Sequence, residues 1–345
     1  GINSINSQST SFIPTKRFEH SATLIDDKLY ILGGLSLSSN LPNVTIGKEF
    51  FYLDFSTSFD NQKLIWKDLT NINKVPSHCD SATANGGLKN TLVLFGGFKF
   101  INVKMDLVYM YDTKKNSWDI PTIEGNEPNR TRALFASIND LGKIYYFGGS
   151  FNDSVVFDMV ILDTINFRWR RGSLIHAPIS REDYGSTILP NQIIVYLGGV
   201  YKDQENLYNH SMNDVYLYDT VNNIWTTKRI IIFGGLTVKE NTDSLYVLNL
   251  TNYVWSIPIV TGKAPSNRDG HRANVIGKYM VISFGNGYNH EFESDILLLD
   301  ISNNDEYEWT NLFDRSSIPI QVDTPTTPKY SDNKFPLIGA IIGLA

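Results

Sequence analysis

One unit of about 50 residues recurs along this chain, and a repeat of that length limits the possible folds more than any other feature. Each unit has an apolar run ending in a glycine doublet (Gly285-Asn286 in the sixth), a second apolar run ending in an acid or amide, and then a tryptophan. Four Trp-to-Gly steps are nearly equal, at 30, 30, 29 and 30 residues, and they run from Trp66 to Gly96, Trp118 to Gly148, Trp169 to Gly198 and Trp255 to Gly285. The chain is therefore expected to stack copies of one small sheet.

Six copies of the unit can be read in register, and their closing tryptophans are Trp66, Trp118, Trp169, Trp225, Trp255 and Trp309. Five units also carry an upstream opening run, which starts at Arg17, Ser77, Arg132, Arg181 and Arg268. Short runs rich in Val, Ile, Tyr and Phe, bounded by Gly, Asn and Asp, are typical of strands. Each unit thus predicts four antiparallel strands, and a radial arrangement would bury the faces of such sheets against their neighbours.

The opening run, the strand ending in Gly-Gly, the run of the Tyr-x-Tyr-Asp type and the tryptophan together resemble the kelch repeat, over roughly Arg17 to Trp309. The resemblance implies an all-β, six-bladed β-propeller with four antiparallel strands per blade, which we place at residues 17–315. The doublets would permit positive φ and a close backbone approach. The tryptophans would fill the space between adjacent blades.

The fifth unit breaks the spacing, because Trp225 and Gly234 are only 9 residues apart. The regular step of 30 would require 21 more residues, and the fifth opening run is absent. We therefore predict that blade five lacks its first strand. A stretch deleted from this sequence, an altered gene model or isoform, and a native three-stranded blade are the alternatives.

The two ends differ from the repeats. We expect an N-terminal tail at 1–16, a Pro/Thr-containing polar linker at 316–336, and an apolar segment at 337–345. The run LIGAIIGLA is shorter than the roughly 20 residues that span a bilayer, and we interpret it as the start of a transmembrane helix. A docking tail and a cleaved anchor signal are alternatives. This interpretation places the propeller at the cell surface or in the lumen of the secretory pathway, with a cytoplasmic location as the alternative.

Composition and short motifs add little about the compartment but exclude one class of partner. The formal net charge is -6 and Lys/Arg clusters are absent, so nucleic acid is not an expected partner. Five glycosylation motifs, at the level that chance would give, leave a glycoprotein as one option. The single Cys79 excludes an internal disulfide and slightly favours a reducing compartment.

The kelch resemblance also brings in galactose oxidase, whose propeller holds copper through two Tyr and two His, with one Tyr linked to Cys. Here Cys79 is the one cysteine, and the six histidines show no HxH or HExxH spacing. The sialidase Asp-box is also absent from the chain. We therefore predict no catalytic residues, no metal and no cofactor, with an enzyme carrying an unrecognised channel site as the alternative.

Charged residues recur at matched repeat positions. We assign one repeat-equivalent position on one face to Arg17, Arg132, Arg181 and Arg268. Carboxylates occur at the start of each third strand, at Glu49, Asp106, Asp158, Asp214, Asp243 and Asp295. This pattern predicts ion pairs between blades. The alternative is a basic ring that captures an acidic peptide or another anion.

Function in a propeller is expected in its loops. The loops of blades four and six should bring aromatic and histidine side chains to a single rim, namely Tyr201, Tyr208, His210, Tyr288, His290 and Phe292. Exposed aromatic residues of this kind form interface hot spots, although some could instead pack between blades. The sequence therefore predicts a non-catalytic module on a membrane anchor that binds a protein or a glycan, with an intracellular kelch scaffold as a variant.

Overall fold

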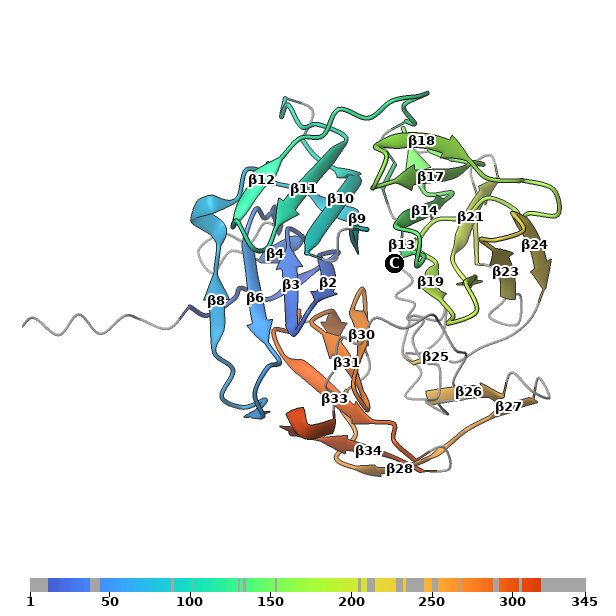
Figure 1. The fold of residues 1–345 in the computed structure, drawn as a ribbon. Coiled ribbons are helices and arrows are strands. Elements are labelled where there is room, and N and C mark those ends of the chain that lie inside the picture. The colour runs from blue at the N-terminus through green and yellow to red at the C-terminus, as the bar shows by residue number, and fades with distance from the viewer. Residues whose placement is uncertain are drawn as a thin grey trace, which may run out of the picture.

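The computed structural model describes residues 12–37, 44–87, 90–100, 102–129, 131–132, 135–152, 154–203, 206–209, 215–227, 232–233, 245–249, 254–266, 268–287, 292–303 and 306–317. In these ranges the chain forms mainly antiparallel sheets and no α-helix. The sheets fan out around a common centre, with β2, β9, β13, β19 and β30 innermost (Figure 1). The prediction of an all-β propeller is confirmed.

We number the blades one to six in chain order. Blade one consists of β2 (Ser21–Ile25), β3 (Lys28–Leu32), β6 (Phe50–Asp54) and β8 (Trp66–Asp68). Blade two consists of β9 (Cys79–Asn85), β10 (Thr91–Phe98), β11 (Val108–Asp112) and β12 (Ser117–Asp119). Blade three consists of β13 (Ala136–Ile138), β14 (Lys143–Phe147), β17 (Met159–Asp163) and β18 (Arg168–Arg171). Blade four consists of β19 (Gly185–Ile188), β20 (Ile193–Leu197), β23 (Val215–Asp219) and β24 (Ile224–Thr227).

Blade five differs from these four. Its described part is a three-stranded sheet of β25 (Ile232–Phe233), β26 (Leu245–Asn249) and β27 (Val254–Ser256), which agrees with the predicted lack of a first strand. Blade six consists of β30 (Arg272–Ile276), β31 (Tyr279–Ser283), β33 (Ile296–Asp300) and β34 (Glu306–Thr310), with β28 (Ile259–Gly262) parallel to β34 at the outer edge.

Small two- and three-stranded sheets lie where the chain leaves the doublets. They are formed by β1 (Arg17–Phe18) with β4 (Leu35–Leu37) and β5 (Val44–Ile46), by β15 (Ser150–Phe151) with β16 (Ser154–Val155), by β21 (Val200–Asp203) with β22 (Asn206–Asn209), and by β29 (Arg268–Asp269) with β32 (Asn286–Gly287). In blades one and six the opening run pairs with the segment after its own doublet, and single bridges do the same in blades three and four. Opening runs and post-doublet segments therefore share one face of the propeller, which we call the doublet face.

Other short elements complete the described chain. A short antiparallel pair joins the first and last blades through β7 (Phe59–Asp60) and β35 (Leu312–Phe313). Two single 3-10 turns, η1 (Thr70–Ile72) and η3 (Arg315–Ser317), follow outer strands.

The repeat tryptophans lie between blades, as the sequence predicts. Trp118 of blade two is 5% exposed, and its ring centroid lies 5.2 Å from that of Phe50 in blade one. Trp225 of blade four is 4% exposed and lies 4.8 Å from Phe147 of blade three. Trp66, Trp169 and Trp309 are also buried in clusters that combine neighbouring blades. The side chain of Trp255 lies outside the described set.

The glycine doublets allow the backbones of adjacent blades to touch. Gly96 has φ +70°, and a Cβ there would lie 2.2 Å from the carbonyl oxygen of Thr131 in the next blade. The amide of Gly97 donates a hydrogen bond to that same carbonyl at 2.9 Å. The equivalent bond from Gly285 to the carbonyl of Arg17, at 3.3 Å, connects blade six to blade one. The predicted close approach is confirmed, because any side chain at Gly96 would collide with main chain.

Within the described ranges, no helix is both long and apolar enough to cross a membrane. The apolar run at 337–345, nearly all of the linker expected at 316–336, and residues 1–11 lie outside those ranges.

Candidate functional site

Three arginines of the opening runs are tied into the propeller by internal bonds. Arg17 and Arg181 are fully buried and Arg268 is 2% exposed. In blade six the structure places Phe284-Gly285, and not Gly285-Asn286, where the other blades have their doublet. Each arginine donates from Nη1 to the carbonyl at the first of these two positions, which is Gly33 or Gly198 at 2.8 Å and, in blade six, Phe284 at 3.3 Å. These guanidinium groups hold each doublet to its own opening run. Whether any of them also contacts a ligand stays a prediction.

Arg132 does not occupy the same position as the other three, which corrects the alignment of the repeats. Arg17 pairs with Ser36, two residues after its doublet, whereas Arg132 pairs with Ser150, the residue directly after its doublet. Thr131, not Arg132, therefore matches Arg17. A register difference of one residue reverses the direction of a strand side chain, so Arg132 points away from the buried position, with its guanidinium 5.3 Å from the ring of Phe98.

Two of the expected ion pairs form, but within repeats and not between blades. Arg17 pairs with Glu49 of its own unit. Arg268 pairs with Asp295 of its own unit at 2.6 Å. The prediction of interblade pairing is wrong for these two because the third strand of each blade begins beside that blade's own opening run. Asp158 is paired differently, with Arg171 on the neighbouring outer strand at 2.8 Å.

The predicted aromatic rim is only partly within the described residues. Tyr201 and Tyr208 are direct cross-strand partners on β21 and β22, and the ring of Phe292 lies 4.7 Å from that of Phe18. The other three rim residues, His210, Tyr288 and His290, lie outside the described set, as does the side chain of Tyr208. Binding by the six residues therefore stays a prediction.

Other aromatic side chains on the doublet face are exposed. Phe98 and Phe100 follow the doublet of blade two and are 40% and 55% exposed. Phe157, in the post-doublet segment of blade three, is 50% exposed. Large apolar rings that remain in water on one face are typical of interaction surfaces.

The doublet face also carries a group of acids that the sequence analysis did not single out. Glu19, Asp80 and Asp183 each have φ +52°, a left-handed conformation that most side chains avoid. Backbone contacts at the doublets show that the three positions are repeat-equivalent, and Gly270 takes the same place in blade six with φ +59°. In the sequence, these residues could have been identified as acids that lie just before an inner strand. Only the blade geometry brings residues so distant in sequence together.

We call Glu19, Asp80 and Asp183 the mouth acids, since they lie at the end of the axial channel that opens on the doublet face. Desolvation by burial, followed by repulsion from a neighbouring acid, raises the pKa of all three. The pKa of Asp80 rises to about 8 and that of Asp183 to about 7. At neutral pH the folded protein therefore retains protons that ordinary carboxylates would have released.

Arg272 lies beside the mouth acids and lines the channel. Its guanidinium stacks 4.3 Å from the ring centroid of Phe135 in blade three. Burial lowers its pKa, against the opposing attraction of Asp80, Asp183 and Glu19. No hydrogen bond or close ion pair joins this guanidinium to any described residue, although it has five N–H donors.

Beyond Arg272 the channel contains a cavity of about 420 Å³, lined by inner strands of blades one, two, three, four and six. Hydroxyl groups join those strands: Thr23 donates to Thr83 at 2.7 Å, and Ser137 and Ser186 share a hydrogen bond at 3.1 Å. The wall therefore combines hydrogen-bonded hydroxyl groups with apolar side chains such as Leu24, Ile138 and Ile188.

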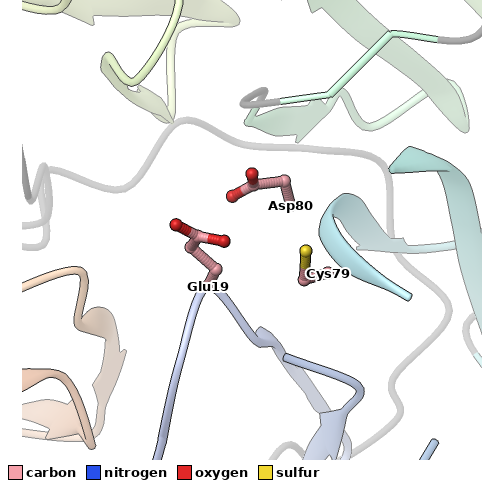
Figure 2. Close-up of side chains that lie close together, drawn as sticks. All are labelled: Glu19, Cys79 and Asp80. Atoms are coloured by element: carbon pink, nitrogen blue, oxygen red, sulfur yellow. The ribbon is translucent and has the colours of Figure 1, made fainter. Parts of the chain in front are cut away.

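One subset of the mouth has donors that metals accept. The side chains of Glu19, Cys79 and Asp80 point toward one another (Figure 2), and their ligand atoms all lie within 4.8 Å of one another. One thiol and two carboxylates would suit Zn²⁺. However, burial and the nearby acids raise the pKa of the Cys79 thiol, and two guanidinium groups act on the same site. The raised thiol pKa opposes metal binding because a metal requires the thiolate, and the guanidinium groups oppose it because they repel a divalent cation.

Comparison with known proteins gives the family. A family model described as the KLHDC2/KLHL20/DRC7 Kelch-repeats domain matches residues 48–229 and 227–339, which is most of the chain.

Three curated relatives show similar but distant matches. Acyl-CoA-binding domain-containing protein 4 of Arabidopsis thaliana is 25% identical over 236 residues, covering 59% of this chain and 34% of the relative. Host cell factor of Drosophila melanogaster is 22% identical over 240 residues, covering 57% and 16%. Kelch domain-containing protein 2 of Bos taurus is 22% identical over 258 residues, covering 71% and 59%. The chain thus matches less than two thirds of each relative's length.

Proposed function

Because the chain belongs to the family of kelch-repeat propellers, whose domains generally mediate protein interactions, we propose that it is a non-catalytic module that binds a protein through its doublet face. One observation carries the choice of face: exposed phenylalanines of blades two and three lie on the same face as a channel mouth whose acids form no close ion pair with a described residue. Propellers and other repeat folds usually bind their partners through loops held on a rigid scaffold.

The exposed rings provide the apolar part of such a surface. Phe100 and Phe157 are each about half exposed, and main-chain bonds hold the segments that carry them. The carbonyl of Phe100 accepts from the amide of Val103 at 3.0 Å, and the amide of Val156 donates to the carbonyl of Gly149 at 2.8 Å. A ring on a fixed backbone loses little entropy when it is buried by a partner. The predicted rim residues Tyr201, Tyr208, His210, Tyr288, His290 and Phe292 would extend the same surface across blades four and six.

The test places a photo-cross-linking amino acid at Phe100 on the doublet face, or at Leu141 as the control. Leu141 is 63% exposed in the turn between β13 and β14, at the opposite end of the blade. In cells that make the protein natively, we expect a discrete cross-linked protein from position 100 and none from position 141. Excess unlabelled protein should abolish the cross-link. Equal cross-linking from both positions, or none from either, would contradict the proposed face.

We also propose that the propeller is displayed on a membrane, in the lumen of the secretory pathway or outside the cell. The support is the run LIGAIIGLA, which follows a Pro/Thr-containing linker and places Gly339 and Gly343 in a small-xxx-small arrangement. The proposal requires further apolar residues after this run in the full-length protein. Full-length protein should stay in the membrane pellet after alkaline carbonate extraction and lose mass on glycosidase treatment. Release by carbonate without a mass change would contradict it.

A further inference from the structure

We propose that blade five takes its first strand from the protein partner, which inserts an extended segment beside β25 from the doublet face. This inference rests on the proposed function, since it describes how a protein partner engages the same face. The segment would complete the sheet through main-chain hydrogen bonds, which is how extended peptides bind to exposed sheet edges.

The connection into blade five is too short to contain a first strand. Only residues 228–231 join Thr227, at the end of β24, to Ile232, at the start of β25. Among the described residues β25 pairs with β26 alone, so its channel side is a sheet edge that can accept another strand. In blades two, three and four the same connection contains the first strand, and it spans 69–90, 120–142 and 172–192.

On the blade-four side of this position, a hydroxyl group lacks the partner that its repeat equivalents have. Thr23, Ser137 and Thr187 occupy one register position in the first strands of blades one, three and four. The hydroxyl of Thr23 donates to Thr83 at 2.7 Å, and that of Ser137 shares a hydrogen bond with Ser186 at 3.1 Å. Both partners lie on the first strand of the next blade. By this equivalence Thr187 faces blade five, and its hydroxyl has no hydrogen bond to a described residue.

On the blade-six side, a buried histidine is unpartnered. The equivalent residues His20, Tyr184 and His271 each place their Cβ beside the second glycine position of their own doublet. His20 shares a hydrogen bond with Ser283 of the preceding blade at 3.1 Å. Tyr184 donates to the carbonyl of Phe135, just before the first strand of the preceding blade, at 3.4 Å. His271 is fully buried, and neither of its ring nitrogens has a hydrogen-bond partner among the described residues.

The partner that His271 lacks is a strand carbonyl. In blade five the place of Ser283 is taken by Phe233, whose ring lies 5.9 Å from that of His271 and has no acceptor. Burial lowers the pKa of His271 to about 3, so the neutral ring has one N–H donor. The main chain of Arg268 lies near the ring but not in hydrogen-bond geometry with either nitrogen. A first-strand carbonyl like the one that Tyr184 uses would accept from this ring, and leaving such a buried group unbonded is costly.

The axial channel gives the segment a route and limits its side chains. The cavity of about 420 Å³ is lined by β19 and β30, the first strands on either side of blade five. First strands converge on the axis, so their side chains there are small, as in Ser21-Ala22-Thr23 and Gly185-Ser186-Thr187. A branched apolar residue follows, which is Leu24 or Ile188. We therefore expect the partner segment to carry three small residues and then a branched apolar one.

The experiment offers the purified full chain a synthetic peptide, RFEHSATLI, which copies residues 17–25 and so contains a complete first strand. Binding should slow amide hydrogen exchange at Ile232 and Phe233 of β25. Exchange at Val254–Ser256 of the outer strand β27 is the internal control and should not change.

Two N-methylated peptides test the strand pairing itself. Alternate N–H groups of an antiparallel strand point at its neighbour. One peptide is methylated at Ala22 and Leu24 and the other at Thr23 and Ile25. One of the two should bind more weakly by on the order of 30-fold, and the other should bind within about 3-fold of the parent peptide.

Histidine variants locate the site on the protein. His271→Phe should weaken binding of the parent peptide by about 5-fold, because it removes the donor to the strand carbonyl. The matched control His20→Phe, at the junction of blades six and one, should bind the peptide normally. The control should nevertheless melt at a lower temperature than His271→Phe, since only His20 loses a hydrogen bond to a described residue.

Three outcomes would overturn the inference: unchanged exchange at β25 with excess peptide, equal binding of both methylated peptides, or unchanged affinity of His271→Phe. Unchanged exchange would mean that the chain itself or a second copy closes this position. If position 100 still gives its cross-link, the proposed function stands and only the strand position is wrong. Peptide binding at β25 without that cross-link would instead contradict the proposed contact through Phe100 and leave the strand position in place.

Discussion

The interblade tryptophans allow a quantitative test of how the propeller is held together, and Trp118 is the best-defined case. Its ring lies on β12, the outer strand of blade two, and is 5% exposed. It packs 5.2 Å from Phe50 of blade one and 5.1 Å from Tyr111 of its own blade. Trp118→Ala would empty the space between these two blades, where the neighbouring sheets cannot close without moving.

The size of the effect follows from the buried area. A buried tryptophan removes about 200 Å² from water, which at about 25 cal/mol per Å² corresponds to about 5 kcal/mol. The alanine Cβ keeps a small part of that area, and residual structure in the unfolded chain lowers the total further. We therefore expect the free energy of unfolding to fall by about 4 kcal/mol, within the range of about 3 to 5 kcal/mol seen for such truncations.

Equilibrium unfolding in urea, followed by far-UV circular dichroism, measures this loss as a lower transition midpoint at unchanged slope. Two phenylalanine variants make the test sharper. Trp118 Nε1 makes no hydrogen bond to a described residue, whereas Trp225 Nε1 donates to the carbonyl of Ser173 at 2.8 Å. Trp225→Phe should therefore cost about 1 kcal/mol more than Trp118→Phe. A loss below about 1 kcal/mol for Trp118→Ala would refute the packing role, since surface changes have that size.

Three further predictions concern charged and titratable groups. Arg17→Met breaks a buried pair with Glu49 and should lower the free energy of unfolding by about 3 kcal/mol. Arg168→Met breaks an exposed pair with Glu124 and should lower it by less than about 1 kcal/mol in the same unfolding assay. Equal losses would contradict the structural role assigned to the buried pair. Because the pKa of folded Asp80 is raised to about 8, the stability that its proton contributes is complete below the unfolded pKa and is lost as pH rises through about 8. The thermal midpoint should thus fall between about pH 4 and about pH 8 and level off above that, and Asp80→Asn should flatten the fall, while parallel profiles would argue against the shift. The Cys79 thiol is buried and its pKa is raised. Native protein should therefore react with iodoacetamide far more slowly than urea-unfolded protein. Comparable rates would show that the thiol is accessible.

The features that sequence predicted correctly are those fixed by local pattern. Strand type, blade order, the buried tryptophans and the close approach at the doublets each depend on residue type at a regular spacing. Gly96 is an example, because its close contact with Thr131 depends only on a doublet in one blade and an opening run at the start of the next blade. The kelch assignment rested on the same regularity, and the family match confirms it.

The errors came from features that spacing alone cannot determine. The opening run of blade three is shifted by one residue, so Arg132 was aligned with Arg17 although Thr131 is its true counterpart. A shift of one residue is invisible in a repeat that tolerates variable loop lengths, yet it reverses which side chain faces inward. The ion pair of Arg17 with Glu49 was assigned to neighbouring blades because sequence gives the repeat position of a residue but not the direction of its side chain.

An opening run can combine a structural and a recognition role because its neighbouring residues face different surroundings. Arg17 donates a hydrogen bond to the main-chain carbonyl of Gly33 and so holds the opening run to the doublet. This bond does not depend on which side chain lies at the mouth. Two residues later, the positive φ at Glu19 turns the chain toward the axis. The equivalent residues are Glu19, Asp80, Asp183 and Gly270, with φ between +52° and +59°, so one backbone shape accepts an acid or no side chain at all. The charge of the channel mouth can therefore vary from blade to blade while the propeller stays the same.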